Sequence, residues 1–180
     1  MSMIVNEGYY LTVYIAVRGC PMIKENGEPD DPSEVGHMWI SVDHPSGLKE
    51  SYGFHPKISG QMHTDVGKVK DSDLHAYQEI NYQRSFPLGE SMYKNLRNYC
   101  QLALEKNTFG PYWGVGNACV DFAWDVMHAA GIDKPFIAKI TPIEDWPAYN
   151  KGLVEMAYYS YMMQVEYEGY RINDAEVWMG

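Results

Sequence analysis

The chain has 180 residues, of which 46% are hydrophobic and 21% charged, a balance typical of one folded globular domain rather than of a disordered segment. Its formal net charge of −10 repels polyanions, which argues against nucleic acids and anionic membrane surfaces as main partners. No stretch reaches the roughly 20 apolar residues of a membrane span, and the N-terminus lacks the basic segment of a signal peptide. We therefore expect one domain over residues 1–180, synthesised in the cytoplasm.

The first third of the chain has the pattern of antiparallel strands. Residues 9–17 are rich in β-branched and aromatic side chains and predict a buried strand. Residues 18–35 contain several prolines and glycines and predict a loop without regular structure. Residues 36–56 predict a β-hairpin whose turn lies at 44–47.

Two helices are expected further along. The polar segment 57–76 is interpreted as irregular, and the weak alternation over 77–86 predicts a third antiparallel strand. Residues 90–106 place apolar side chains at three- and four-residue spacing, which is typical of an amphipathic helix. A second helix is expected over 118–130, with Asn117 as its N-cap. The fold class that follows is α+β, with an antiparallel sheet packed against helices.

One of the three cysteines occupies a position suited to chemistry. Cys20, Cys100 and Cys119 are odd in number and lack the two-residue spacing of a zinc knuckle, so neither a disulfide framework nor a metal knuckle is indicated. Cys119 falls in the first turn of the second helix, where backbone N–H groups and the positive end of the helix dipole favour a thiolate and an oxyanion. Position alone does not distinguish this nucleophile from a small buried cysteine that fills space.

A thiolate nucleophile requires a nearby base, which is usually a histidine. His37 opens the first strand of the hairpin, and strand alternation predicts that it faces Gly53 and His55 of the returning strand, with Ser51 farther along. Gly53 leaves room beside the imidazole, and His55 is a neighbour able to fix its tautomer. Without Cys119, a half-exposed histidine at a strand end would be the simpler interpretation.

Three segments together resemble a known family. They are GHMWISV at 36–42, SYGFHP at 51–56 and NACVDFAWDVMHAAGI at 117–132. In this order they resemble the circularly permuted papain-like cysteine hydrolases of the NlpC-type superfamily, and most closely the cell-wall amidase effectors of bacterial type VI secretion systems. The resemblance covers about residues 9–131, implies a papain-like fold and leaves the C-terminal extension 132–180 unmatched.

The resemblance also implies roles for individual residues. Cys119 is the implied nucleophile and His37 the general base, with His55 or alternatively Ser51 as the third, orienting residue. Asn117 is first a helix cap and secondarily a part of the oxyanion site.

The remaining expectations concern substrate and partners. Trp39, Tyr112 and Trp113 could wall a substrate groove, although each could equally belong to the core. The expected reaction is amide hydrolysis through a thioester, and by resemblance the substrate is the peptide of peptidoglycan. No cofactor or metal is expected. The resemblance further implies an immunity protein, a secretion-system delivery protein and action in the periplasm of a target cell.

Other classes of function stay open at this point. One alternative keeps the catalytic pair but acts on lipid or protein substrates, as a thiol hydrolase or acyltransferase. Another is a non-catalytic binding module, in which Cys119 and His37 are packing residues that never meet. A metal hydrolase is less favoured, because no two-histidine ligand spacing such as HExxH occurs in the sequence.

Overall fold

The structure is a computed structural model, and it describes residues 8–34, 36–57, 63–64, 66–107, 109–113 and 118–132. For residues 63, 64 and 113 the description is limited to the backbone. Most of the C-terminal extension expected at 132–180 therefore lies outside the described residues, as does Asn117.

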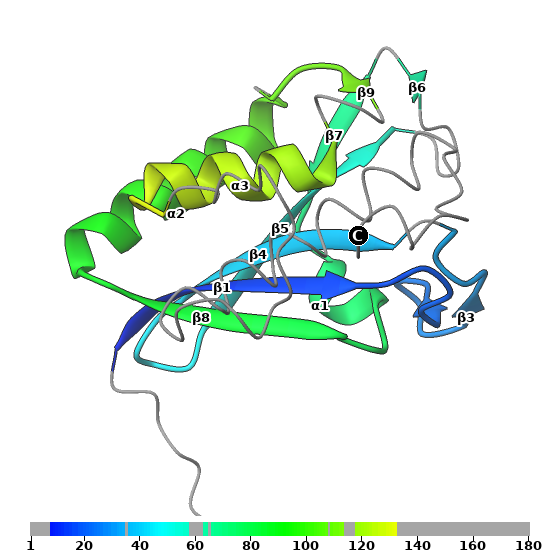
Figure 1. Ribbon diagram of the computed structural model, residues 1–180, viewed down its shortest axis with the longest axis horizontal. Helices are drawn as coiled ribbons and strands as arrows, with labels where there is room; N and C mark the ends of the chain where they lie inside the picture. Colours follow the sequence, from blue (N-terminus) through cyan, green and yellow to red (C-terminus); the bar gives the residue numbers. More distant parts are fainter. Residues whose placement is uncertain are drawn as a thin grey trace, which may run out of the picture.

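A five-stranded antiparallel sheet forms the centre of the described part of the chain (Figure 1). Its strands, in spatial order, are β7 (Gly67–Lys70), β5 (Lys49–Pro56), β4 (His37–Asp43), β1 (Tyr9–Ala16) and β8 (Tyr82–Leu88). The predicted hairpin is confirmed as β4 and β5, and the turn between them contains Gly47 at φ +90°, a backbone conformation that glycine adopts without strain. With the helices described below, the sheet confirms the α+β class.

Two long helices, α2 (Glu90–Lys106) and α3 (Cys119–Ala129), lie on one side of the sheet, and the short α1 (Asp73–Ala76) lies on the other (Figure 1). Of the apolar side chains whose spacing predicts α2, Leu96, Cys100 and Ala103 are buried, and Met92, Tyr99 and Leu104 are partly buried against the core. Both predicted helices are thus confirmed, because their apolar periodicity matches the face that packs on the sheet.

Strand alternation divides the interior into two clusters. Met38, Ile40 and Val42 of β4 belong to the main core, beneath α2 and α3. Trp39, which points the opposite way, packs in a second cluster that includes Tyr14. His37 precedes Trp39 by two residues, so the register assigns it to the second face, at the end of β4.

Two segments expected to lack regular structure contain short elements. The expected loop at 18–35 holds a two-stranded ribbon of β2 (Met22–Ile23) and β3 (Pro29–Asp30). The expected irregular segment at 57–76 holds β7, α1 and β6 (His63–Thr64), which pairs with β9 (Tyr112–Trp113). These expectations were wrong because the short elements are held by partners distant in sequence, which local composition does not reveal. No helix among the described residues combines the length and apolarity needed to cross a membrane.

Candidate active site

Cys119 is the first residue of α3, and its side chain is fully buried. The N-cap is Ala118 rather than the expected Asn117, and the backbone N–H of Ala118 donates a hydrogen bond to Oδ2 of Asp121 at 2.8 Å. The carboxylate of the first turn therefore caps the helix from within. Because Cys119 is the first residue of this 11-residue helix, it lies at the positive end of the helix dipole. That end favours the negative charge of a thiolate.

His37 and His55 meet across the hairpin. Ile40 pairs with Tyr52 in the register of β4 and β5, and the same register carried to the strand end sets His37 opposite His55. The centroids of the two imidazole rings are 4.1 Å apart. The structure thus brings together the two histidines that strand alternation predicts to be neighbours.

Asp73, which no sequence pattern indicates, joins the two histidines. Its Oδ2 lies 3.2 Å from Nε2 of His37, and its Oδ1 lies 2.8 Å from Nε2 of His55. Because an ionised carboxylate only accepts hydrogen bonds, both Nε2 atoms donate to it. The chain reaches this position because β7 pairs Lys70 with Gly53, which leaves Asp73 three residues beyond that pair.

Gly53 makes this arrangement possible. A Cβ atom at this position would lie 1.9 Å from Oδ2 of Asp73 and 2.7 Å from Nε2 of His37, far inside van der Waals contact. Gly53 was the one sequence signal that a group approaches His37 closely. Asp73 itself is one of 24 acidic residues in a segment expected to be irregular, so nothing local distinguished it.

The third contact of His37 is with Cys119, whose side chain forms a hydrogen bond with the imidazole. Since Nε2 donates to Asp73, Nδ1 is the ring nitrogen left to face the sulfur. Cys119, His37 and Asp73 therefore form a hydrogen-bonded series of thiol, imidazole and carboxylate. In the binding-module alternative, the first two of these residues would not meet.

The electrostatics of the series favour a charged imidazole. Burial and the neighbouring His55 lower the pKa of His37, but the charge and hydrogen bond of Asp73 and the hydrogen bond of Cys119 outweigh them, so this pKa lies above its ordinary value. Burial raises the pKa of Asp73, but the charges and hydrogen bonds of the two histidines lower it more. The pKa of Asp73 therefore lies well below its usual range. His37 also stacks on Tyr77 and Trp39, with ring centroids 5.0 and 5.7 Å away, and these rings stabilise an imidazolium.

Of the remaining site residues expected from the sequence, those whose side chains the structure describes do not take the roles expected of them. Trp39 and Tyr112 have exposed fractions of 0% and 1%, so they belong to the interior and do not wall an exposed groove. The side chain of Trp113 lies outside the described residues. Ser51 donates its hydroxyl to the carbonyl oxygen of Asp71 at 3.0 Å, a contact that does not involve His37.

The same cluster contains side chains suited to a metal ion. One nitrogen each of His37 and His55 and an oxygen of Asp73 all lie within 4.8 Å of one another. Two imidazole nitrogens and one carboxylate oxygen form a donor set that divalent transition metals accept. Sequence spacing did not indicate this group, because Asp73 follows His37 by 36 residues and His55 by 18.

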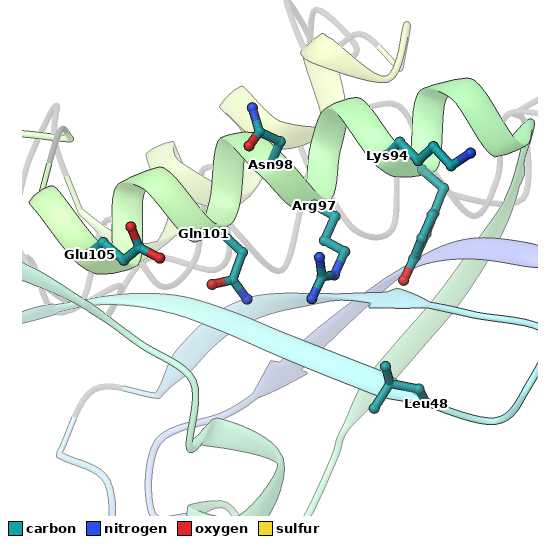
Figure 2. A pocket seen from close by; sticks show the side chains of 7 residues that line it. Leu48, Lys94, Arg97, Asn98, Gln101 and Glu105 are labelled. Atoms are coloured by element: carbon teal, nitrogen blue, oxygen red, sulfur yellow. The ribbon is translucent and has the colours of Figure 1, made fainter.

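A separate cavity of about 570 Å³ lies beside α2, between this helix and Leu48, the residue before β5 (Figure 2). It is lined by Leu48, Tyr93, Lys94, Arg97, Asn98, Gln101 and Glu105. None of Cys119, His37 and Asp73 contributes to this lining, so the cavity is distinct from the candidate active site.

Comparison with known proteins adds no relative: no protein-family model, no curated protein and no solved structure matches this chain.

Proposed function

We propose that this protein is a cysteine hydrolase that cleaves an amide bond, built on a circularly permuted papain-like fold of the NlpC type. Cys119 is the nucleophile, His37 the general base and Asp73 the residue that orients His37. The observation that carries this function is the hydrogen bond between Cys119 and an imidazole whose other nitrogen is held by a buried carboxylate. Nucleophile, base and orienting acid in contact form the arrangement that covalent hydrolysis requires.

The reaction proceeds in two halves. His37 takes the thiol proton, the sulfur of Cys119 attacks the amide carbonyl carbon, and the C–N bond breaks as the imidazolium returns its proton to the leaving amine. The resulting thioester is then attacked by a water molecule that His37 deprotonates, which releases the carboxylic acid and restores the thiol. The dipole of α3 stabilises the negative charge of the thiolate before it attacks and again when it leaves the thioester.

Asp73 has two functions in this scheme. By accepting the Nε2–H bond it keeps the Nδ1 lone pair of His37 directed at Cys119, and its negative charge stabilises the imidazolium. His55 shares the same carboxylate through the other oxygen, which holds Asp73 in place. Of the three side chains in this histidine–aspartate cluster, His55 is the most exposed, at 14%, so substrate approaches the buried sulfur from its side.

The substrate proposed is the peptide of bacterial peptidoglycan, and the biological role proposed is that of an antibacterial type VI secretion effector. Both rest on the resemblance of the histidine strand and the cysteine helix to those amidases. On this proposal the protein acts in the periplasm of a target cell, and a delivery protein and an immunity protein are its partners.

Incubation with purified sacculi tests this function. The wild-type protein is expected to release soluble peptide fragments that mass spectrometry identifies by the bond cut, and Cys119→Ala to release none. Cys100→Ala is the matched control, because Cys100 is also a buried helical cysteine but packs in α2. Equal release by wild type and Cys119→Ala would overturn the cysteine mechanism.

A different outcome would redirect the substrate assignment. If sacculi stay intact but Cys119-dependent cleavage of ester or thioester substrates is seen, a thiol hydrolase or acyltransferase that acts on lipid or protein substrates is favoured. Intact sacculi and no Cys119-dependent turnover of any of these substrates would favour the binding module.

A further inference from the structure

We propose that His37, His55 and Asp73 form a zinc-binding site, and that an ion bound there stops hydrolysis by Cys119. The three ligand atoms come from β4, β5 and α1, and all lie within 4.8 Å of one another. Both imidazoles already direct Nε2 at the carboxylate of Asp73, with N–O distances of 3.2 Å from His37 and 2.8 Å from His55. The ligands therefore converge before any ion arrives, and Gly53 provides the space in which they do so.

The donor set selects the kind of ion. Two imidazole nitrogens with one carboxylate oxygen are the ligands of three-residue zinc sites, in which water or substrate takes the fourth position. Calcium and magnesium prefer sites made mainly of oxygen atoms, so they fit this cluster less well. Zinc–ligand bonds are about 2.0–2.2 Å long, and an ion between the three atoms replaces the two hydrogen bonds with small side-chain rotations.

Burial supports the same assignment. The side chains of His37 and Asp73 are 3% and 2% exposed, so the carboxylate charge is compensated by the histidines rather than by bulk water. A divalent cation held at this point would pair with a desolvated negative charge, a favourable setting for metal binding. The ion would enter from the side of His55, which is 14% exposed.

Metal binding would disable the general base without occupying the nucleophile. An ion on Nε2 of His37 replaces the proton of that nitrogen, and Nδ1 remains the nitrogen that faces Cys119. Because the neutral ring then carries its one proton on Nδ1, it has no lone pair left with which to accept a proton from the attacking water. Thioester hydrolysis would therefore stop. This inhibitory part rests on the proposed function, whereas metal binding itself does not.

Zinc binding is tested on a variant that lacks the nucleophile and cannot catalyse hydrolysis. Metal-free Cys119→Ala retains all three ligands and is titrated with zinc chloride against a chromogenic chelator. We expect one zinc ion per chain, with an affinity within about threefold of the wild type. His55→Ala should weaken binding by at least about tenfold, since it removes one ligand. His75→Ala, which alters an exposed histidine of α1 outside the cluster, should leave the affinity unchanged.

A second measurement covers the case in which His55→Ala unfolds. Cobalt(II) replaces zinc in the wild type and in Cys119→Ala, and the visible spectrum reports its coordination. Spectra of four-coordinate cobalt without a sulfur-to-cobalt charge-transfer band are expected from both proteins. Loss of binding in Cys119→Ala, or a sulfur band in the wild type, would show that the thiol is the ligand and overturn the site. The site would also be overturned if the protein failed to bind one ion per chain, or if a folded His55→Ala bound zinc with wild-type affinity.

The inhibitory part is tested with the sacculus assay in the presence of EDTA or of zinc. Zinc is expected to suppress fragment release by the wild type, and EDTA to restore it. Binding without suppression would overturn the inhibitory part and leave the site. If sacculi are not cut under any condition, the hydrolase proposal fails, while the titration of Cys119→Ala still decides the metal site.

Discussion

The carboxylate of Asp73 accepts a hydrogen bond from Nε2 of His37 at 3.2 Å, although Asp73 lies 36 residues later in a helix of only four residues. This contact determines which ring nitrogen carries a proton and therefore which one faces Cys119. It also fixes the charge balance of the site, because the buried carboxylate opposes the effect of burial on the imidazole.

Asp73→Asn should reduce hydrolysis by about 10²- to 10⁴-fold, because an amide neither fixes the tautomer of His37 nor stabilises its positive charge. The pH profile should change as well. Asp73 raises the pKa of His37, and the imidazolium is lost as the pH rises through that pKa. Removal of the carboxylate should therefore move the alkaline limb of the profile to lower pH. The measurement is the initial rate of fragment release from sacculi against pH, in EDTA; a lower rate with an unmoved limb would indicate a purely structural role.

His55→Ala should have a smaller effect on hydrolysis than Asp73→Asn, with a loss below about tenfold, because the bond between His37 and Asp73 remains. Positive charge on His55 lowers the pKa of His37, so its removal should move the alkaline limb to higher pH, opposite to the Asp73 variant. Both variants are compared in the same assay, with folding checked by circular dichroism. A loss as large as that of Asp73→Asn would identify His55 as the orienting residue.

The parts of the fold that the sequence predicts are those determined by local patterns. Alternation over β4 and β5 places His37 opposite His55, and apolar periodicity places Cys119 at the start of α3. Asp73 could not be found this way. Its four-residue helix has no periodicity to detect, and its position depends on the pairing of β7 with β5 and on the absence of a side chain at Gly53.

The aromatic residues also show that local sequence patterns do not determine which side chains line the site. From the sequence, Trp39 and Tyr112 could wall a substrate groove or could equally belong to the core. Both are almost completely buried, and Trp39 stacks between Tyr14 and the ring of His37. Composition shows that a chain is rich in aromatic residues, but only the packing shows whether a given ring contacts the core or the solvent.

Gly53→Ala should abolish most hydrolysis, since its Cβ would force Asp73 away from His37. The backbone needs no special conformation there, so the effect should arise from this local displacement rather than from strain. Gly89→Ala is the matched control, because a Cβ at Gly89 meets no atom within 4 Å. Fragment release and the thermal midpoint are measured for both. Wild-type activity of Gly53→Ala would contradict the requirement for contact between Asp73 and His37.

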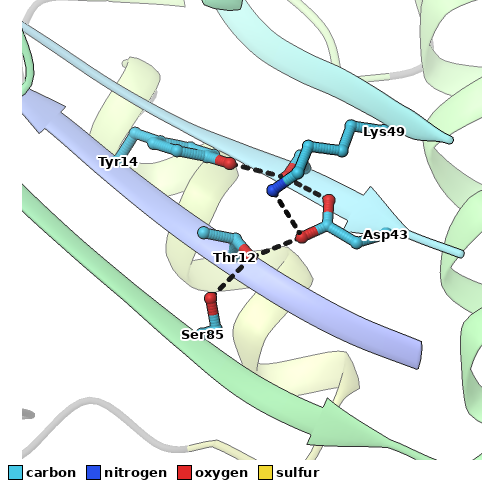
Figure 3. Close-up of polar contacts among 6 residues, drawn as sticks. Thr12, Tyr14, Asp43, Lys49 and Ser85 are labelled. Carbon is cyan, nitrogen blue, oxygen red and sulfur yellow. Dashed lines mark hydrogen bonds and ion pairs between the residues drawn. The ribbon is translucent and has the colours of Figure 1, made fainter. Parts of the chain in front are cut away.

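Thr12→Val should lower the free energy of unfolding by about 1–3 kcal/mol while leaving hydrolysis by the folded protein unchanged. The buried hydroxyl of Thr12 donates to Oδ2 of Asp43 at 2.7 Å and contacts the hydroxyl of Ser85 at 2.9 Å (Figure 3). Valine has the same shape but leaves Asp43 only Ser41 and Lys49 as side-chain partners within this network. Asp43 ends β4 six residues after His37, about 20 Å along the strand, so the candidate site should not respond.

Urea unfolding measures this change, and Thr12→Ser is the control because it keeps the hydroxyl and should lose less stability. If Thr12→Ser were as destabilised as Thr12→Val, the methyl group of Thr12 rather than its hydrogen bonds would account for the loss. If instead Thr12→Val lost hydrolysis at full stability, the polar network and the catalytic series would have to be coupled through β4. That outcome would contradict the separation of about 20 Å along β4 between this network and the candidate site.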